Sequence, residues 1–213
     1  MIAIIDYKAG NLTSVKRALD FLGQEAIVTN DYSRVLKADR IIFPGVGAAG
    51  RAMADLKSQG LDKAILESFY MKKPILGICL GTQIIMEMSQ ENNTKCLGLI
   101  KGGVRRFPDD LSDEEGRRLK VPHMGWNRVK WEKRHPVFNG IEPESEFYFV
   151  HSYYPSPDLP ETILGETLYG KWFASVLTME NLVAMQFHPE KSGRPGLKII
   201  SNFCRWSGRE YAE

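Results

Sequence analysis

One stretch decides the fold: Pro74-Ile75-Leu76-Gly77-Ile78-Cys79-Leu80-Gly81-Thr82-Gln83. An apolar run leads into Gly-x-Cys-x-Gly, and a helix-forming run, Ile84-Ile85-Met86-Glu87-Met88, follows it. Strand, tight turn and helix is the layout of a nucleophile elbow, with Cys79 in the place of serine. One glycine would permit close backbone approach and the other unusual dihedral angles. The thiol would face a helix N-terminus, which favours a thiolate, but a buried cysteine between two packing glycines fits the motif equally well.

Upstream of Cys79, strands alternate with helices. Apolar runs predict buried strands at residues 2–5, 26–28 and 40–43. Helical patterns cover residues 12–22, where Gly23 ends the helix, and residues 52–57 and 61–70. This alternation predicts an α/β fold with a doubly wound, mostly parallel central sheet flanked by helices.

The second half of the chain has a different pattern. It contains short apolar or alternating segments at residues 104–107, 128–131, 147–150, 172–176 and 182–187. They predict antiparallel additions to the same sheet or a small second sheet in the C-terminal half. Residues 109–120 carry both charge signs densely, which indicates a solvated hairpin or loop, and residues 197–206 predict a closing helix. We expect residues 1–213 to form a single domain.

Composition excludes several classes of function. The chain has 213 residues, of which 43% are hydrophobic and 25% charged, as in ordinary soluble proteins. A net charge of +2 gives no reason to expect nucleic acid or an acidic membrane surface as a partner. Three cysteines make neither a disulfide framework nor a metal-ligand pattern, and they indicate a reducing compartment. The sequence shows no signal peptide and no run long enough to span a membrane, so we expect a cytoplasmic protein. We also expect it to need no metal and no cofactor.

His188 and Glu190 follow the last predicted strand and are the partners that a catalytic Cys79 needs. In open α/β sheets, sites form beyond the carboxyl ends of the strands, where all three residues fall. If extended geometry continues through Pro189, the His188 and Glu190 side chains project from one face. Glu190 would then orient the imidazole, whose other nitrogen accepts the proton of Cys79. A histidine satisfied by backbone is the alternative for His188 alone, but the three residues together predict a catalytic triad.

Pro44-Gly45-Val46-Gly47 is a second candidate part of the site. Attack of a thiol on an amide or ester makes an oxyanion that needs backbone donors aimed at it. The Leu80 amide is one candidate by analogy with the elbow, and the Val46 or Gly47 amide is the second. A plain strand-to-helix turn fits the same residues.

These motifs resemble a known family. Gly77-Ile78-Cys79-Leu80-Gly81-x-Gln83 with His188-Pro189-Glu190 resembles the class I (triad) glutamine amidotransferase domain. Five further stretches are similar to the glutaminase subunits of imidazole glycerol phosphate synthase: Asp6-Tyr7-x-Ala9-Gly10-Asn11, Pro44-Gly45-Val46-Gly47, Pro122-His123-Met124-Gly125-Trp126-Asn127, Tyr148-Phe149-Val150-His151-Ser152-Tyr153 and Gln186-Phe187-His188-Pro189-Glu190-Lys191-Ser192. The resemblance spans essentially the whole chain.

The resemblance implies hydrolysis of L-glutamine to glutamate and ammonia through a glutamyl thioester on Cys79. It implies that Gln83, with the backbone around His151, Ser152 and Tyr153, holds the glutamine. It also implies a heterodimer with a separate cyclase subunit, a (β/α)₈ barrel that uses the ammonia to make imidazole glycerol phosphate in histidine biosynthesis. Such a barrel needs about 250 residues, so this chain cannot contain both parts.

The same resemblance places four residues at the junction with the partner: Asn11, Trp126, Tyr148 and Lys191. Each has a structural alternative, since an aromatic residue can simply pack and a lysine can be solvated. The chain departs from the family at three positions, with Lys8 for a glycine, Thr82 for a methionine and Ala49 for a bulky aromatic residue.

Three alternatives to this function stay open. The same chemistry could feed another acceptor, as in a sugar-modifying amidotransferase. The chain could be a stand-alone thiol hydrolase, or a scaffold that retains the fold without catalysis.

Overall fold

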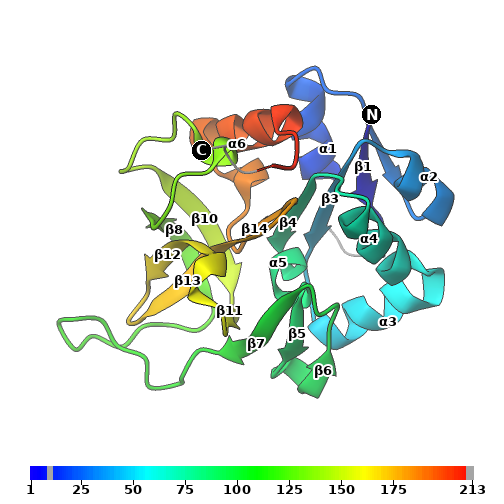
Figure 1. Ribbon diagram of the computed structural model, residues 1–213. Coiled ribbons are helices and arrows are strands. Elements are labelled where there is room, and N and C mark those ends of the chain that lie inside the picture. Colours follow the sequence, from blue (N-terminus) through cyan, green and yellow to red (C-terminus); the bar gives the residue numbers. More distant parts are fainter. Residues whose placement is uncertain (9–11, 210–213) are drawn as a thin grey trace.

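An eight-stranded sheet forms the centre of the molecule (Figure 1). This computed structural model describes residues 1–8 and 12–209, so Asn11 lies outside the described residues. The strand order is β2-β1-β3-β4-β14-β13-β12-β9. Five neighbouring strands are parallel: β2 (Ala26–Thr29), β1 (Ile2–Ile5), β3 (Arg40–Gly45), β4 (Ile75–Cys79) and β14 (Leu182–Met185). Three continue the sheet in antiparallel fashion: β13 (Trp172–Met179), β12 (Ile163–Leu168) and β9 (Lys130–Trp131).

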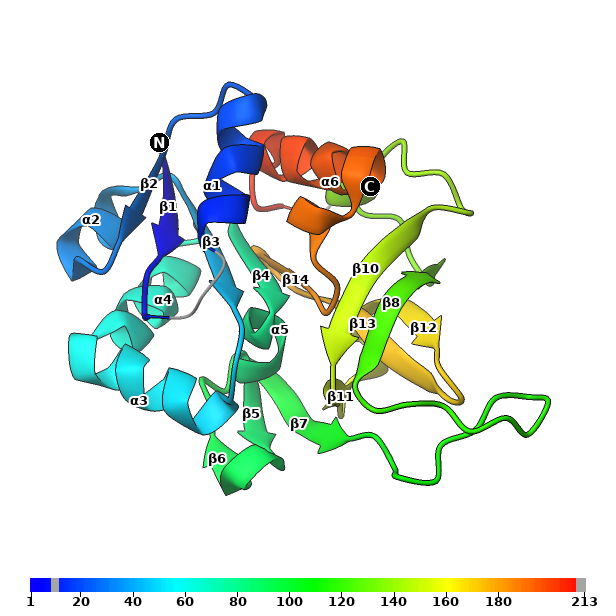
Figure 2. The ribbon, with the colours of Figure 1, turned by 180° about the vertical axis from the view of Figure 1, so that it is seen from behind.

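Helices cover both faces of the parallel half, as Figures 1 and 2 show. On one face α1 (Leu12–Phe21) lies beside α6 (Gly193–Arg205), and on the other α3 (Ala49–Gln59) packs against α4 (Leu61–Tyr70). Ile4 of β1 belongs to the core cluster of the first helix pair, whereas Ile5 belongs to that of the second. Because successive strand residues point to opposite faces, a strand covered on both sides must be apolar throughout. The predicted doubly wound α/β fold is confirmed.

Two smaller sheets lie beside the central one. One pairs β8 (His123–Arg128) with β10 (Glu146–His151). The other has the order β11 (Tyr153–Pro157), β7 (Ile100–Arg106), β5 (Met86–Ser89) and β6 (Thr94–Lys95). Both forms left open by the sequence therefore occur, antiparallel additions and separate small sheets. Residues 109–120 form a projecting loop with one isolated bridge, Ser112 to Arg118.

Two local predictions are wrong, and one helix was not predicted. The helix after Cys79, α5 (Leu80–Ile84), ends early, because Met86 pairs with Ile100 and the segment becomes β5. Residues 128–131 are divided between β8 and β9, which belong to different sheets. The helix α2 (Tyr32–Lys37) was not predicted; it is short, and its first turn is capped by the Asp31 carboxylate. Tertiary pairing and capping override weak local preference in each case.

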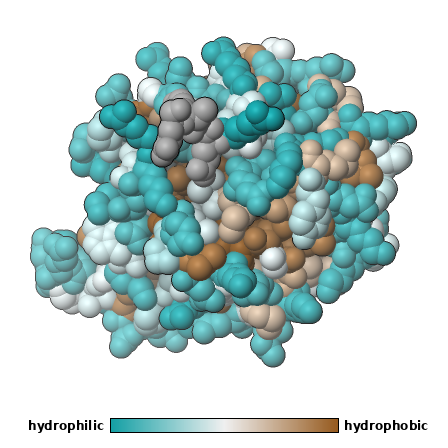
Figure 3. All heavy atoms as spheres, viewed as in Figure 1, coloured by the Kyte–Doolittle hydropathy of each residue, from teal (hydrophilic) through white to brown (hydrophobic). Residues whose placement is uncertain are grey.

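The surface in Figure 3 is mostly hydrophilic, with an apolar area near the middle of the view. Within residues 1–8 and 12–209, no helix is long and apolar enough to cross a membrane. The same residues contain no group of three or more His, Cys, Asp or Glu side chains arranged to hold a metal ion.

Candidate active site

Cys79 ends β4 and begins α5 in a strained backbone conformation, with φ 53° and ψ −106°. The prediction that a glycine takes the unusual dihedral angles is wrong, because neither Gly77 nor Gly81 has a positive φ. Both glycines are required for space. A Cβ on Gly77 would lie 2.9 Å from the Ala184 Cβ, and one on Gly81 would lie 2.0 Å from the Phe43 carbonyl oxygen. The two glycines thus allow α5 to pack closely, and the residue with the strained backbone is Cys79, as expected of a nucleophile elbow.

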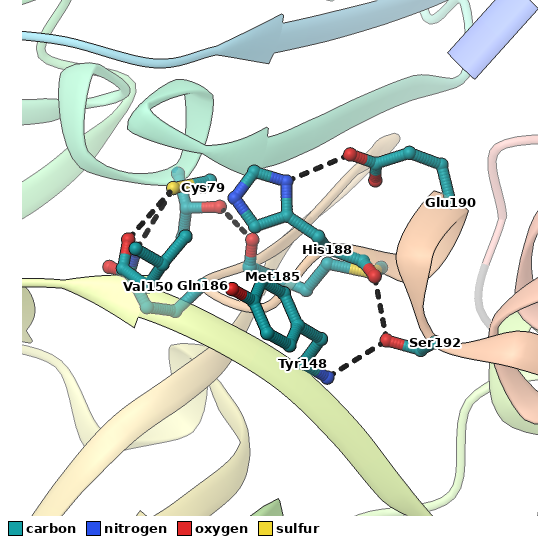
Figure 4. A network of polar contacts seen from close by, with 9 residues as sticks. Cys79, Tyr148, Val150, Met185, Gln186, His188, Glu190 and Ser192 are labelled. Carbon is teal, nitrogen blue, oxygen red and sulfur yellow. Dashed lines mark hydrogen bonds and ion pairs between the residues drawn. The ribbon is translucent and has the colours of Figure 1, made fainter. Parts of the chain in front are cut away.

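His188 and Glu190 form a buried ion pair beside this elbow. The His188 Nδ1 lies 2.8 Å from the Glu190 Oε1, with side chains 2% and 1% exposed. The other ring nitrogen of His188 is turned toward Cys79 (Figure 4). The expected extended geometry is wrong, because Pro189–Lys191 form a 3₁₀ helix, η4. The turn brings the side chains together, whereas two extended residues would separate them by roughly 6.6 Å.

Three hydrogen bonds fix the position of His188. Its N–H donates to the Tyr148 carbonyl oxygen of β10 over 2.9 Å. The Ser192 hydroxyl donates to the His188 carbonyl oxygen over 2.6 Å and accepts from the Tyr148 N–H over 3.0 Å. The main chain of His188 is therefore held to β10 at its N–H and, through the Ser192 hydroxyl, at its carbonyl oxygen. This fixes the position from which the imidazole projects.

The charges around His188 decide its protonation. Burial lowers its pKa, but hydrogen bonds and charges from Cys79 and Glu190 outweigh burial and raise the pKa to about 10. These contacts favour the imidazolium form of His188. An imidazolium next to Cys79 already carries the proton that a thiol must lose, so the arrangement suits a thiolate–imidazolium pair.

A cavity of about 360 Å³ opens in front of Cys79. Its lining contains every residue predicted for the oxyanion and substrate sites: Val46, Gly47, Leu80, Gln83, His151, Ser152 and Tyr153. The oxyanion candidates arrive there because β3 and β4 are paired with Gly45 opposite Cys79. Gly47 has φ +99°, a conformation that requires glycine.

Two of the predicted substrate contacts are already engaged within the protein. The Gln83 Nε2 donates to the Tyr153 carbonyl oxygen over 2.9 Å and to the Gln186 Oε1 over 3.0 Å. Of the Gln83 side-chain amide, only the oxygen is left to bind a ligand. Both ring nitrogens of His151 are occupied, by the Tyr153 carbonyl oxygen at 2.8 Å and by His123 at 3.0 Å. His151 thus shapes the cavity with a side chain that has no free polar atom.

Glu91, which was not predicted as a site residue, also lines the cavity. It lies in η1 (Glu91–Asn93), and its Oε2 accepts a 2.6 Å hydrogen bond from the Ala49 N–H at the start of α3. No motif marks Glu91, since only the packing of η1 against α3 carries it to the cavity. Among the residues that line the cavity, Glu91 is the one with a carboxylate side chain.

Three predicted junction residues gather on one exposed surface. Trp126 of β8 is 55% exposed and lies opposite Tyr148 of β10, with ring centroids 6.0 Å apart. The Lys191 Nζ lies 5.7 Å from the centroid of the Tyr148 ring. We call these three residues the Trp126 patch. It adjoins His188, because the Tyr148 and His188 rings are 6.4 Å apart.

The fold and the site define a class of proteins. The profile of the family "Glutamine amidotransferase class-I" matches residues 3–206. A solved structure titled "Crystal structure of glutamine amidotransferase" superposes with a TM-score of 0.71 at 18% identity, covering 98% of this chain and 100% of the other. The chain belongs to the class I glutamine amidotransferases.

Curated relatives narrow the class. The imidazole glycerol phosphate synthase subunit HisH of Maridesulfovibrio salexigens is 53% identical over 206 residues, which cover 97% of each chain. The protein of the same name from Neisseria meningitidis serogroup B is 48% identical over 210 residues, covering 96% of this chain and 99% of its own. Within its class, the chain is a member of the HisH family.

Proposed function

We propose that this chain hydrolyses L-glutamine with a Cys79–His188–Glu190 triad and passes the ammonia to a separate cyclase subunit in histidine biosynthesis. The observation that carries the proposal is the buried His188–Glu190 pair facing a cysteine on a strained elbow. The relatives support the choice of pathway, because they are named as subunits of imidazole glycerol phosphate synthase.

In the first half of the reaction the Cys79 sulfur attacks the side-chain carboxamide carbon of glutamine. A C–S bond forms, and the carbonyl electron pair moves to oxygen. His188 then gives its proton to the nitrogen, the C–N bond breaks and ammonia leaves. The raised pKa of His188 suits this role, because the imidazole is already protonated when the substrate binds.

The second half of the reaction releases glutamate. A water molecule gives a proton to His188 and attacks the glutamyl thioester. The C–S bond breaks, and glutamate leaves with Cys79 restored as a thiolate. Glu190 holds the same imidazole nitrogen throughout, so the other nitrogen serves first as acid and then as base.

The cavity lining supplies groups for both ends of the substrate. The Leu80 amide and the Val46 or Gly47 amide would stabilise the oxyanion. The Gln83 carbonyl oxygen and the Glu91 carboxylate would accept hydrogen bonds from the substrate's α-ammonium group. Backbone groups of Ser152 and Tyr153 would complete the binding site.

The Trp126 patch is the proposed contact with the cyclase subunit, a (β/α)₈ barrel in a heterodimer. An exposed tryptophan beside a tyrosine and a lysine has the composition of an interface anchor. The patch also lies against His188, so ammonia released from the triad would have a short path to the partner. Residues 1–213 would act as one domain without a cofactor.

Replacement of Cys79 tests the proposal. We expect Cys79→Ala to abolish ammonia release from glutamine while circular dichroism and binding to the cyclase subunit stay unchanged. Cys204→Ala is the control, since Cys204 lies on α6 outside the cavity lining. Ammonia release by Cys79→Ala would overturn the mechanism. Full glutaminase activity without cyclase binding would instead point to another acceptor.

A further inference from the structure

Gln186 touches the reacting sulfur but belongs to no part of the triad. It directly follows β14, is 0% exposed, and its Nε2 lies 3.7 Å from the Cys79 Sγ (Figure 4). Its backbone N–H donates to the Ser175 carbonyl oxygen of β13 over 2.8 Å, which fixes the main chain of Gln186 against the neighbouring strand. The side-chain amide therefore reaches the sulfur from a rigid element.

The direction of the Gln186 amide follows from its neighbour Gln83. The Gln83 Nε2 contacts the Tyr153 carbonyl oxygen, which can only accept, so this nitrogen is the donor. Its second proton is aimed at the Gln186 side-chain oxygen at 3.0 Å. With its oxygen facing Gln83, Gln186 must present N–H to Cys79. A reversed amide would place two donors against each other.

The hydrogen bonds continue from the Tyr153 carbonyl oxygen away from Cys79, and the donor and the acceptor of each bond can be assigned. The His151 Nδ1 donates to the Tyr153 carbonyl oxygen, so the His151 Nε2 accepts from the His123 Nδ1. Burial lowers the pKa of His123 to about 4 and that of His151 to about 3, which keeps both rings neutral. The His123 Nε2 then accepts from Asn127, whose amide also donates to the Leu168 carbonyl oxygen. Each donor has one matching acceptor, so the whole network favours one orientation.

We propose that Gln186 is a further catalytic residue, whose amide N–H donates to the Cys79 sulfur and holds it as a thiolate in front of His188. Gln83 is the positioning residue that sets the direction of this amide. A hydrogen bond to a charged acceptor is stronger than one to a neutral thiol, so the bond favours the reactive form. The inference rests on the proposed role of Cys79 as the nucleophile.

Alkylation of Cys79 by iodoacetamide across a range of pH tests the inference, with the modified peptide quantified by mass spectrometry. Gln186→Met keeps the length of the side chain but removes the donor. We expect the pH midpoint of alkylation to rise by about one unit and kcat for glutaminase to fall about 10-fold or more, with KM changed little. Gln186→Glu, which places an acceptor in the same space, should shift the midpoint further upward.

Thr82→Val is the matched control. Thr82 is 0% exposed and lies on α5, but its hydroxyl donates to the Met185 carbonyl oxygen over 2.6 Å and does not contact the sulfur. This variant loses one buried hydrogen bond and should keep the wild-type pH midpoint. An upward shift equal to that of Gln186→Met would show a general effect of destabilisation, which would overturn the inference.

Each outcome can be assigned. A wild-type pH midpoint in folded Gln186→Met overturns the role of Gln186. If that variant does not fold, Gln83→Met serves in its place, because it removes the bond that orients Gln186, together with the bond to the Tyr153 carbonyl oxygen, and leaves the Gln186 amide present. Alkylation needs no bound glutamine, so the loss of a substrate contact does not affect this readout; we expect a smaller upward shift of the pH midpoint, and no shift overturns the inference. Failure of the proposed function has a different signature, namely no selective alkylation of Cys79 in the wild-type protein.

Discussion

The carboxylate of Glu190 and the imidazole of His188 are 2.8 Å apart in a buried environment, so the charge of Glu190 acts without screening by water. Glu190→Gln keeps the side-chain shape and removes that charge. The His188 pKa should fall, because one of the groups that raise it is lost, so the imidazole becomes a poorer base and carries its proton less often at neutral pH. We expect kcat/KM for glutamine to fall by roughly 10²- to 10⁴-fold, as for acid-to-amide changes in other triads.

Glu180→Gln is the control for this prediction. Glu180 pairs with Lys72 at an exposed site, and both side chains are at least half exposed. The same substitution there should leave kcat/KM within twofold of the wild-type value. Equal activity of the Glu190→Gln and Glu180→Gln variants would contradict the role given to Glu190.

Lys8 occupies a backbone conformation that favours glycine, with φ 65°. Its N–H donates to the Asp6 Oδ1 over 3.0 Å, which holds the turn in this conformation. The left-handed region costs a residue with a Cβ about 1 kcal/mol. Lys8→Gly should therefore raise the free energy of unfolding by about 1 kcal/mol in urea denaturation. Lys8→Ala keeps the strain and should give no gain; an equal gain in both variants would contradict this explanation.

At the scale of elements, the 3₁₀ helix η2 (Pro136–Phe138) is capped by a buried histidine. The His135 Nδ1 accepts a hydrogen bond from the Val137 N–H over 3.2 Å, and burial lowers the His135 pKa to about 4. Between that pH and the unfolded pKa of about 6.5, the unfolded chain binds more protons than the folded one. Stability from neutral His135 is thus complete above pH 6.5 and decreases as the pH falls toward 4.

His135→Asn tests this pH dependence, because asparagine can still cap η2 but does not titrate. We expect the slope of unfolding free energy against pH between 6.5 and 4 to decrease by up to about 1.4 kcal/mol per pH unit relative to wild type. Urea denaturation at several pH values measures it. Carboxylates titrate in the same range in both proteins and cancel in the comparison. An unchanged slope would contradict the account.

The elements that sequence predicted best are those with a repeated apolar pattern. β1, β3 and β4 are continuous apolar runs, and they pair as expected of strands covered on both faces. The proximity of Cys79 to His188 could be predicted, because Cys79 ends β4 and His188 lies just beyond β14, and these two strands are parallel neighbours. Glu91 and Gln186 could not be assigned roles, because their contacts come from packing between distant elements. The conformation of η4 was also missed, since nothing local distinguishes a tight turn from extended chain after Pro189.

At the scale of the whole molecule, the Trp126 patch predicts where a partner binds. Trp126→Ala should weaken binding to the cyclase subunit by roughly 10- to 100-fold, because a desolvated tryptophan commonly anchors an interface. Trp172→Ala is the matched control, since Trp172 is 48% exposed and lies on β13 of the eight-stranded sheet, outside the Trp126 patch. Isothermal titration calorimetry with the purified cyclase subunit measures both. Equal weakening, or none in either variant, would contradict the position of the interface.

The most direct measurement of the central claim is the site of covalent modification by a glutamine analogue with an electrophilic side chain. We expect one adduct per chain, mapped by mass spectrometry to Cys79. Its formation should be slowed by excess L-glutamine, and it should be absent from Cys79→Ala. The other two cysteines, Cys96 and Cys204, should stay unmodified, since burial raises the pKa of each thiol to about 11. An adduct on Cys96 or Cys204, or modification of Cys79 that glutamine does not slow, would contradict the account.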